Sequence, residues 1–295
     1  MTTASPRLYL ERPGPLMFFW GTFRQAFVAA YEDNCFGVAK SAAYSALLAF
    51  FPVLASIAAI LAQVNAQSVA RVFSRLLFEV VPPGTEELVR SQFAAHGQRP
   101  FWLILAAVLL SALAASGAMI SLMDGFQAAY RLPSGRPFLK QRGVAVLLVF
   151  IAAVPAIGSS MLIVFGARTE QWMLGWLGLP PEAEIRTGVI LVFGLLRYLV
   201  ALAATVLVTG LLYYVAPNRP LKFSGVWPGA WLATFLWLAA TSGFGWYVRN
   251  IANYSVLYGS IGAVIALLVW MYLIAVIALI GCEYNAVRER LLMGL

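Results

Sequence analysis

The chain has 295 residues, of which 62% are hydrophobic and 11% are charged, and its formal net charge at pH 7 is +8. A soluble domain carries roughly 25% charged residues, so the composition excludes a soluble domain and predicts that lipid is the main solvent. Because the basic residues are scattered between apolar runs, we interpret the charge as membrane orientation and attraction to anionic lipid, and not as nucleic-acid binding.

A short helix is predicted at residues 16–31, after a polar and proline-broken tail at residues 1–15 that we expect to be disordered in the cytoplasm. Apolar side chains recur at helical spacing on one face, whereas Arg24 and Gln25 lie on the other. This pattern is typical of an amphipathic helix that lies in the membrane interface. The apolar face consists of Leu16, Phe19, Trp20, Phe23, Phe27 and Ala30.

Six apolar stretches follow, and each is long enough to cross a hydrocarbon core of ~30 Å at ~1.5 Å per residue. The last of them has no charged residue from Val256 to Cys282. We therefore predict an all-α, polytopic membrane protein with a single membrane domain over residues 16–290. The expected spans lie at about 38–63, 101–123, 143–165, 187–215, 226–244 and 256–282, with a helical cap on the outer face at 65–100 and a cytoplasmic tail at 291–295.

The distribution of Lys and Arg predicts the orientation. If the amino terminus lies inside, the inner loops carry more Lys and Arg than the outer loops. Most of the outer basic residues then belong to the long segment at 65–100, whose charges count less. Both termini are therefore expected in the cytoplasm, since six spans return the chain to the side on which it started.

Five residue strings stand out along the chain: AAYSALLAFFPVLA at Ala42–Ala55, LYYVAPNRP at Leu212–Pro220, WPGAWLATFLW at Trp227–Trp237, ANYSVLYGSIGAVIALLVWMYL at Ala252–Leu273 and GCEYNA at Gly281–Ala286. In their order and spacing they resemble the YihY/BrkB-like family of bacterial inner-membrane proteins. The match extends over nearly the whole chain from the first helix onward, although Tyr284 replaces the leucine that is usual in the family. The resemblance implies six spans in the inner membrane and a transport-related role in the cell envelope, with links to lipid export or serum resistance in some members.

The family has also carried a ribonuclease label, which the residues do not support. A metal-dependent nuclease needs His, Asp and Glu ligands that converge on a cation, whereas this chain has one histidine, His96, without a companion motif. Phosphate-binding loops, nucleophile elbows and paired cysteines at metal spacing are also absent from the sequence. We expect no enzymatic activity, cofactor or metal site, and we interpret Cys35 and Cys282 as reduced structural thiols.

Arg197 is the first candidate functional residue, because it interrupts the apolar stretch at 187–215. If this span starts near Thr187, the guanidinium lies about ten residues deep, where a charge costs ~2.5 to 3.5 kcal/mol. An anionic head group is one candidate partner for such a charge. Alternatively the span starts near Phe193, and Arg197 reaches the outer interface along its aliphatic stem.

The other candidates have both a functional and a structural interpretation. Asp124 and Glu283 end inward-running spans, so each is either a gating or proton-coupling carboxylate or a solvated charge that fixes the depth of its span. Asn285 is grouped with these gating or coupling candidates, and its structural interpretation is that it satisfies carbonyls at its own helix end. Pro52 and Pro155 are hinges if the spans move, and static kinks if they do not.

Three aromatic residues, Tyr44, Tyr258 and Trp270, either line a cavity among the spans or face lipid. With Arg197 they form the expected substrate site of a transporter or exporter of a lipid or amphiphilic envelope component. Membrane lipids, anionic ones included, are the expected partners. The alternative is a non-transporting scaffold of an envelope assembly, while an ion channel is disfavoured because the spans lack a charged or carbonyl-rich filter.

Overall fold

The computed structural model describes residues 14–63, 101–133, 136–154, 158, 184–250 and 260–293, and no strand occurs among them. The helices are α1 (Pro15–Glu32), α2 (Cys35–Gln63), α5 (Phe101–Ala129), α7 (Glu184–Val215), α8 (Phe223–Asn250) and α10 (Ser260–Met293). Residues 138–154 are helical as well. The all-α prediction therefore holds for the described part of the chain.

Five of the described helices are long and apolar enough to cross a membrane, as judged by length and composition. The expected third span at 143–165 and the expected cap at 65–100 lie partly or wholly outside the described residues, so the total of six spans stays a prediction. The candidate spans are Cys35–Ile60, Phe101–Ala129, Leu191–Val215, Phe223–Val248 and Gly262–Met293.

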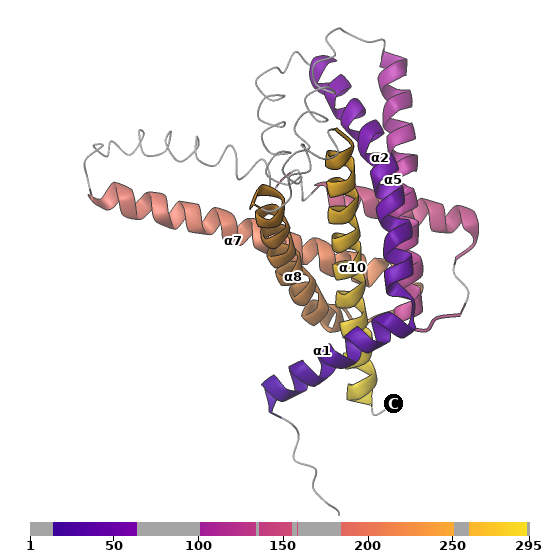
Figure 1. The fold of residues 1–295 in the computed structure, drawn as a ribbon, viewed down its shortest axis with the longest axis vertical. Coiled ribbons are helices and arrows are strands. Elements are labelled where there is room, and N and C mark those ends of the chain that lie inside the picture. Colours follow the sequence, from indigo (N-terminus) through magenta and orange to yellow (C-terminus); the bar gives the residue numbers. More distant parts are fainter. Residues whose placement is uncertain are drawn as a thin grey trace, which may run out of the picture.

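The central unit consists of α2, α5, α8 and α10. In Figure 1, α2, α5 and α10 run in roughly the same direction, and α8 leans against α10. The largest apolar cluster lies where these helices meet, and it is rich in alanine, with Met123, Phe126, Leu279 and Tyr213 as its larger buried members. Small side chains let helix backbones approach closely, which is how helices without a hydrophobic driving force associate in lipid.

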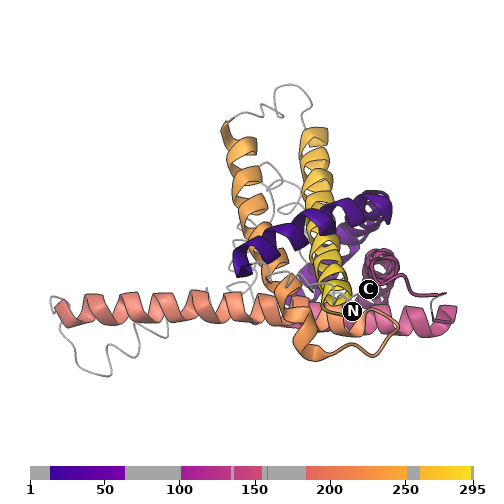
Figure 2. The same ribbon diagram turned by 90° about the horizontal axis from the view of Figure 1, so that it is seen from below.

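The long helix α7 lies differently from the other candidate spans. Figures 1 and 2 both show its N-terminal half projecting away from the rest of the molecule, whereas its C-terminal half reaches α8. Leu191, Val192, Leu195 and Leu196 are accordingly more than half exposed. The apolar character of this stretch was predicted, but its direction relative to the bundle was not.

The predicted helix at 16–31 is present as α1, but its two faces are used differently than expected. The small residues Ala26 and Ala29 pack against Tyr284 and Val287 of α10. The bulky side chains of the predicted apolar face, such as Leu16 and Trp20, are mostly exposed. In Figure 1, α1 crosses the bundle obliquely near the C-terminal end of α10. Its place in the membrane interface remains a prediction.

The observed helices extend beyond several expected boundaries. α5 continues past the predicted end at 123 to Ala129, and α10 continues to Met293, through most of the expected tail at 291–295. Helix ends carry charged residues that hydropathy penalises, so an apolar window stops before the hydrogen-bonded helix does.

Candidate functional site: a buried polar cluster between α1, α2 and α10

Glu283 of α10 is the most deeply buried acidic side chain that the structure describes, with an exposed fraction of 0%. The Cys35 thiol of α2 donates to its Oε1 over 3.6 Å, and Arg290 Nη2 lies 3.9 Å from its Oε2. Within the described residues Oε2 accepts no hydrogen bond. Glu283 is therefore shielded from solvent at its helix end. A buried, incompletely satisfied carboxylate is energetically costly to keep.

A second carboxylate, Asp33, faces Glu283 from the corner that joins α1 to α2. Asp33 acts electrostatically on Glu283, and its own Oδ2 has no hydrogen-bond partner among the described side chains and backbone. The corner is formed by Asn34, whose φ of 56° is left-handed and is tolerated by asparagine better than by most residues. Two facing carboxylates repel each other at low dielectric unless a proton or a cation lies between them.

Asn285, two residues beyond Glu283, binds the first turns of α8. Its Oδ1 accepts from the Gly229 N–H over 2.7 Å, and its Nδ2 donates to the Val226 carbonyl over 2.9 Å. These bonds flank Pro228, which lies inside α8 and has no N–H to donate. The interpretation of Asn285 is thus corrected in one respect: the carbonyl that it satisfies belongs to α8, and not to its own helix end.

Two glycines allow α8 and α10 to approach closely enough for this contact. A Cβ added to Gly281 would lie 2.8 Å from both the Gly229 carbonyl oxygen and the Ala233 Cβ, and would also meet the Tyr213 hydroxyl. A Cβ added to Gly229 would meet the Gly281 carbonyl oxygen. The strings WPGAW and GCEYNA, distant in the sequence, therefore form one helix crossing.

Two arginines, Arg136 and Arg219, make further polar contacts at the same end of the bundle. Arg219 forms an ion pair with Glu289 at 2.6 Å, and its guanidinium lies 5.8 Å from the centre of the Tyr130 ring. Burial raises the pKa of Tyr130 well above its ordinary value, and the neighbouring Cys282 and Glu289 act in the same direction. Arg136 donates to the carbonyl of Val215, the last residue of α7, and to those of Ala216 and Pro217 just after it, at 2.8–3.2 Å. Arg136 therefore caps the C-terminal end of α7.

The expected substrate-site residues do not converge on one cavity in the described structure. Arg197 is half-buried on α7, with its guanidinium 5.7 Å from the centre of the Tyr198 ring. Tyr44 is 60% exposed, and Trp270 packs in a small apolar cluster with Leu267. Tyr258 lies outside the described residues. The expected substrate site combines Arg197 of α7 with Trp270 of α10, but α7 meets α10 farther along both helices, where Tyr213 donates to the Ala278 carbonyl over 2.7 Å.

The remaining gating candidates are also placed. Asp124 lies inside α5, is exposed, and accepts a 2.8 Å hydrogen bond from Gln141. Pro52 lies within α2, which continues past it to Gln63. Pro155 falls outside the described residues. These positions do not test whether Asp124 is a gating carboxylate or whether Pro52 and Pro155 are hinges.

Sequence reasoning missed Cys35 and Asp33 as members of the cluster around Glu283. Cys35 is 248 residues away from Glu283, so no local spacing links the two. The only available sign was that both cysteines were placed near the same membrane face. Cys35 and Cys282 are both free and buried in the structure, and their reduced state stays a prediction.

A bundle of long apolar helices with buried polar contacts at one end defines a polytopic helical membrane protein. The model of the Virulence factor BrkB family matches residues 26–293, and the chain belongs to this family. The resemblance to YihY/BrkB-like proteins is thereby confirmed. No solved structure shows a significant match.

Relatives of this chain come from several bacteria. A ribonuclease-like protein, YfkH, of Bacillus subtilis is 28% identical over 259 residues, which cover 86% of this chain and 90% of the relative. A UPF0761 membrane protein of Tolumonas auensis is 26% identical over 271 residues, covering 91% of this chain and 83% of the relative.

Among the residues that the structure describes, no group of three or more His, Cys, Asp or Glu side chains could hold a metal ion.

Proposed function

We propose that the protein transports or exports a lipid or another amphiphilic component of the bacterial cell envelope across the inner membrane, with both termini in the cytoplasm. The observation that carries this proposal is the burial of Glu283 against Asp33 inside an otherwise apolar bundle. Ionisable residues within membrane helices are expensive to keep, and they commonly mark ion or substrate pathways. Family membership supports a membrane role without naming a cargo.

The carboxylate pair supplies a mechanism for coupling. When a proton or cation lies between Glu283 and Asp33, the α1–α2 corner is held against α10. When both carboxylates are charged, their repulsion favours separation of these elements. Such a two-state contact can open one side of a membrane protein in response to an ion, which is the requirement for alternating access.

Arg197 has the role of receiving an anionic group of the cargo. It lies on α7, whose N-terminal half exposes apolar side chains on the flanks of the arginine, among them Leu195, Leu196 and Leu199. A lipid that approached along this helix would meet apolar side chains for its acyl chains and a guanidinium for its head group. We propose no catalytic role for any residue, because the sequence lacks a motif for one.

The test is lipid movement by the purified protein in vesicles that contain a fluorescent phospholipid. The wild-type protein is expected to move the lipid faster than empty vesicles do, and Glu283→Gln is expected to remove most of this activity. Glu289→Gln is the matched control, since it makes the same change on the same helix at a partly exposed position. A wild-type rate equal to that of empty vesicles would contradict the proposal.

A scaffold function is the second candidate, and one observation favours it. The projecting half of α7 exposes the apolar side chains of Leu191, Val192, Leu195 and Leu196, and a membrane partner could pack there. A scaffold would complement a deletion strain in cells while moving no lipid in vesicles, and substitutions on the exposed face of α7 would disrupt this complementation.

A further inference from the structure

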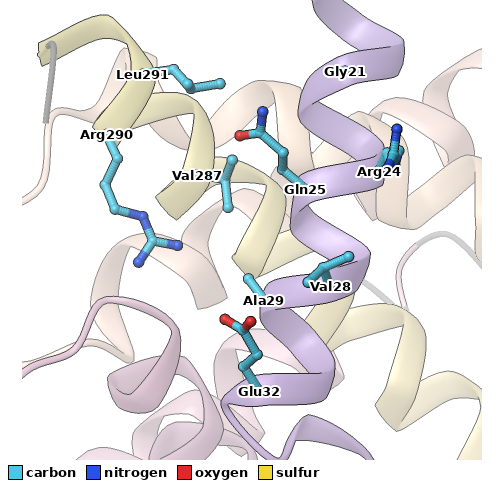
Figure 3. Close-up of a pocket in the computed structure, with 9 residues that line it drawn as sticks. All are labelled: Gly21, Arg24, Gln25, Val28, Ala29, Glu32, Val287, Arg290 and Leu291. Atoms are coloured by element: carbon cyan, nitrogen blue, oxygen red, sulfur yellow. The ribbon is translucent and has the colours of Figure 1, made fainter.

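A groove of about 520 Å³ lies between α1 and the C-terminal end of α10. Figure 3 shows Gln25 and Glu32 extending from α1 toward α10, and the Arg290 guanidinium extending from α10 into the space between the helices. Arg24 of α1 lies at the groove as well. The groove is separate from Arg197 and from the helix crossing of α8 and α10.

The groove contains charges of both signs that other described residues leave unneutralised. Arg24 and Glu32 are exposed and form no ion pair within the part of the chain that the structure describes. Arg290 has one ionic contact there, the 3.9 Å approach to Glu283, which is longer than a hydrogen bond. Two guanidinium groups and one carboxylate thus have donors and an acceptor available for a ligand.

Apolar side chains lie between and beside these charges. Ala29 and Val287 are buried at the helix contact, whereas Val28 and Leu291 are about half exposed at the edges of the groove. Farther along α1, Trp20 exposes a large apolar surface. An amphiphile could therefore place its polar end between the charges and the beginning of an acyl chain along α1.

We propose that this groove binds the head group of an aminophospholipid, in which a primary ammonium lies next to the phosphate. The phosphate contacts the Arg290 guanidinium, the charge of Arg24 at the other side of the groove attracts it, and the ammonium donates to the Glu32 carboxylate. An anionic head group without an ammonium would bring its phosphate near Glu32 and leave that carboxylate unpaired. A quaternary ammonium carries positive charge but no N–H to donate. This site does not depend on the proposed transport function.

The test compares phospholipids with identical acyl chains that carry phosphoethanolamine, phosphocholine or phosphoglycerol head groups. Binding to the full-length protein in detergent is measured by titration and native mass spectrometry. The ethanolamine lipid is expected to bind about tenfold more tightly than the choline lipid, because only the primary ammonium can donate a charge-assisted hydrogen bond to the Glu32 carboxylate. Glu32→Gln should reduce this ratio to near one, while Arg24→Gln should weaken both lipids.

Arg288→Gln is the control, since Arg288 is a partly exposed arginine of α10 outside the groove, and it should leave all three affinities unchanged. Both groove substitutions affect exposed side chains, and unchanged thermal unfolding would establish that the variants are folded. The proposal is overturned if the glycerol lipid binds most tightly, if the ethanolamine and choline lipids bind equally, or if Glu32→Gln leaves their ratio unchanged.

Discussion

At the scale of single residues, Asn285 and Glu283 lie at the same end of α10 but make different kinds of contact. Asn285 makes two buried hydrogen bonds with the backbone of α8, so its contribution is to hold two helices together. Glu283 is buried but only partly satisfied, with a thiol donor on one oxygen and a distant arginine on the other. The first residue stabilises one arrangement, whereas in the proposed mechanism the second makes the neighbouring contact responsive to ions.

Asn285→Ala is expected to destabilise the protein, because it leaves the Gly229 N–H and the Val226 carbonyl without their buried partner. Each buried unsatisfied group costs about 1–3 kcal/mol, so a fall of at least about 2 kcal/mol in the free energy of unfolding is expected in detergent. Asn250→Ala is the control, because Asn250 is exposed and bonds only to the Trp246 carbonyl of its own helix. Equal effects of the two substitutions would argue against the bridging role.

At the scale of secondary-structure elements, the crossing of α8 and α10 fixes the site. Pro228 interrupts the hydrogen-bond ladder of α8, and Asn285 bonds to the backbone at Val226 and Gly229 on either side of it. Gly229 and Gly281 lack the side chains that would keep the helices apart. The tight α1–α2 corner then places Asp33 next to Glu283. The helix crossing positions Asn285 against α8, and the α1–α2 corner positions Asp33 against Glu283.

Gly281→Ala is expected to disturb this crossing. The added methyl group would meet the Gly229 carbonyl, the Ala233 side chain and the Tyr213 hydroxyl, and overpacking of this kind costs about 1–3 kcal/mol. The matched control is Gly243→Ala in α8, where a Cβ meets nothing within 4 Å and helix propensity should make the change neutral or favourable by up to about 1 kcal/mol. Thermal unfolding of both variants in detergent checks this difference.

The reactivity of the two cysteines tests whether the helix contacts that bury them stay closed. Cys35 is 2% exposed and Cys282 is 0% exposed, so neither thiol should react appreciably with a maleimide reagent in the folded protein. Reaction should become complete in denaturant. Rapid labelling of Cys282 in the native protein would show that the helix crossing is open more often than its packing implies.

At the scale of the whole molecule, the sequence predicted the helices better than their arrangement. Apolar length is a local property, so the stretches now seen as α2, α5, α7, α8 and α10 were identified before the structure was known. The direction of α7 and the meeting of Cys35 with Glu283 depend on tertiary packing across long sequence separations. For the same reason burial of Glu283 could not be predicted, since its neighbours Arg288 and Arg290 suggested a solvated helix end.

The central claim is that the contact between the α1–α2 corner and α10 has two states governed by Glu283 and Asp33. The groups facing this contact are Asp33, Cys35, Cys282, Tyr130 and Arg290, from four parts of the chain. A proton on Glu283 at low pH removes its repulsion with Asp33 and should favour the closed contact, whereas the charged Glu283 carboxylate at high pH should favour the open one.

The most direct measurement is the distance between spin labels at the exposed positions Met17 of α1 and Leu292 of α10, recorded over a range of pH in lipid nanodiscs. The wild-type sequence is expected to give two distance populations whose ratio changes with pH, and Glu289→Gln should behave in the same way. Glu283→Gln should give one population at every pH. A single unchanging distance in the wild-type background, or a Glu283→Gln variant that still responds to pH like the wild type, would contradict the claim.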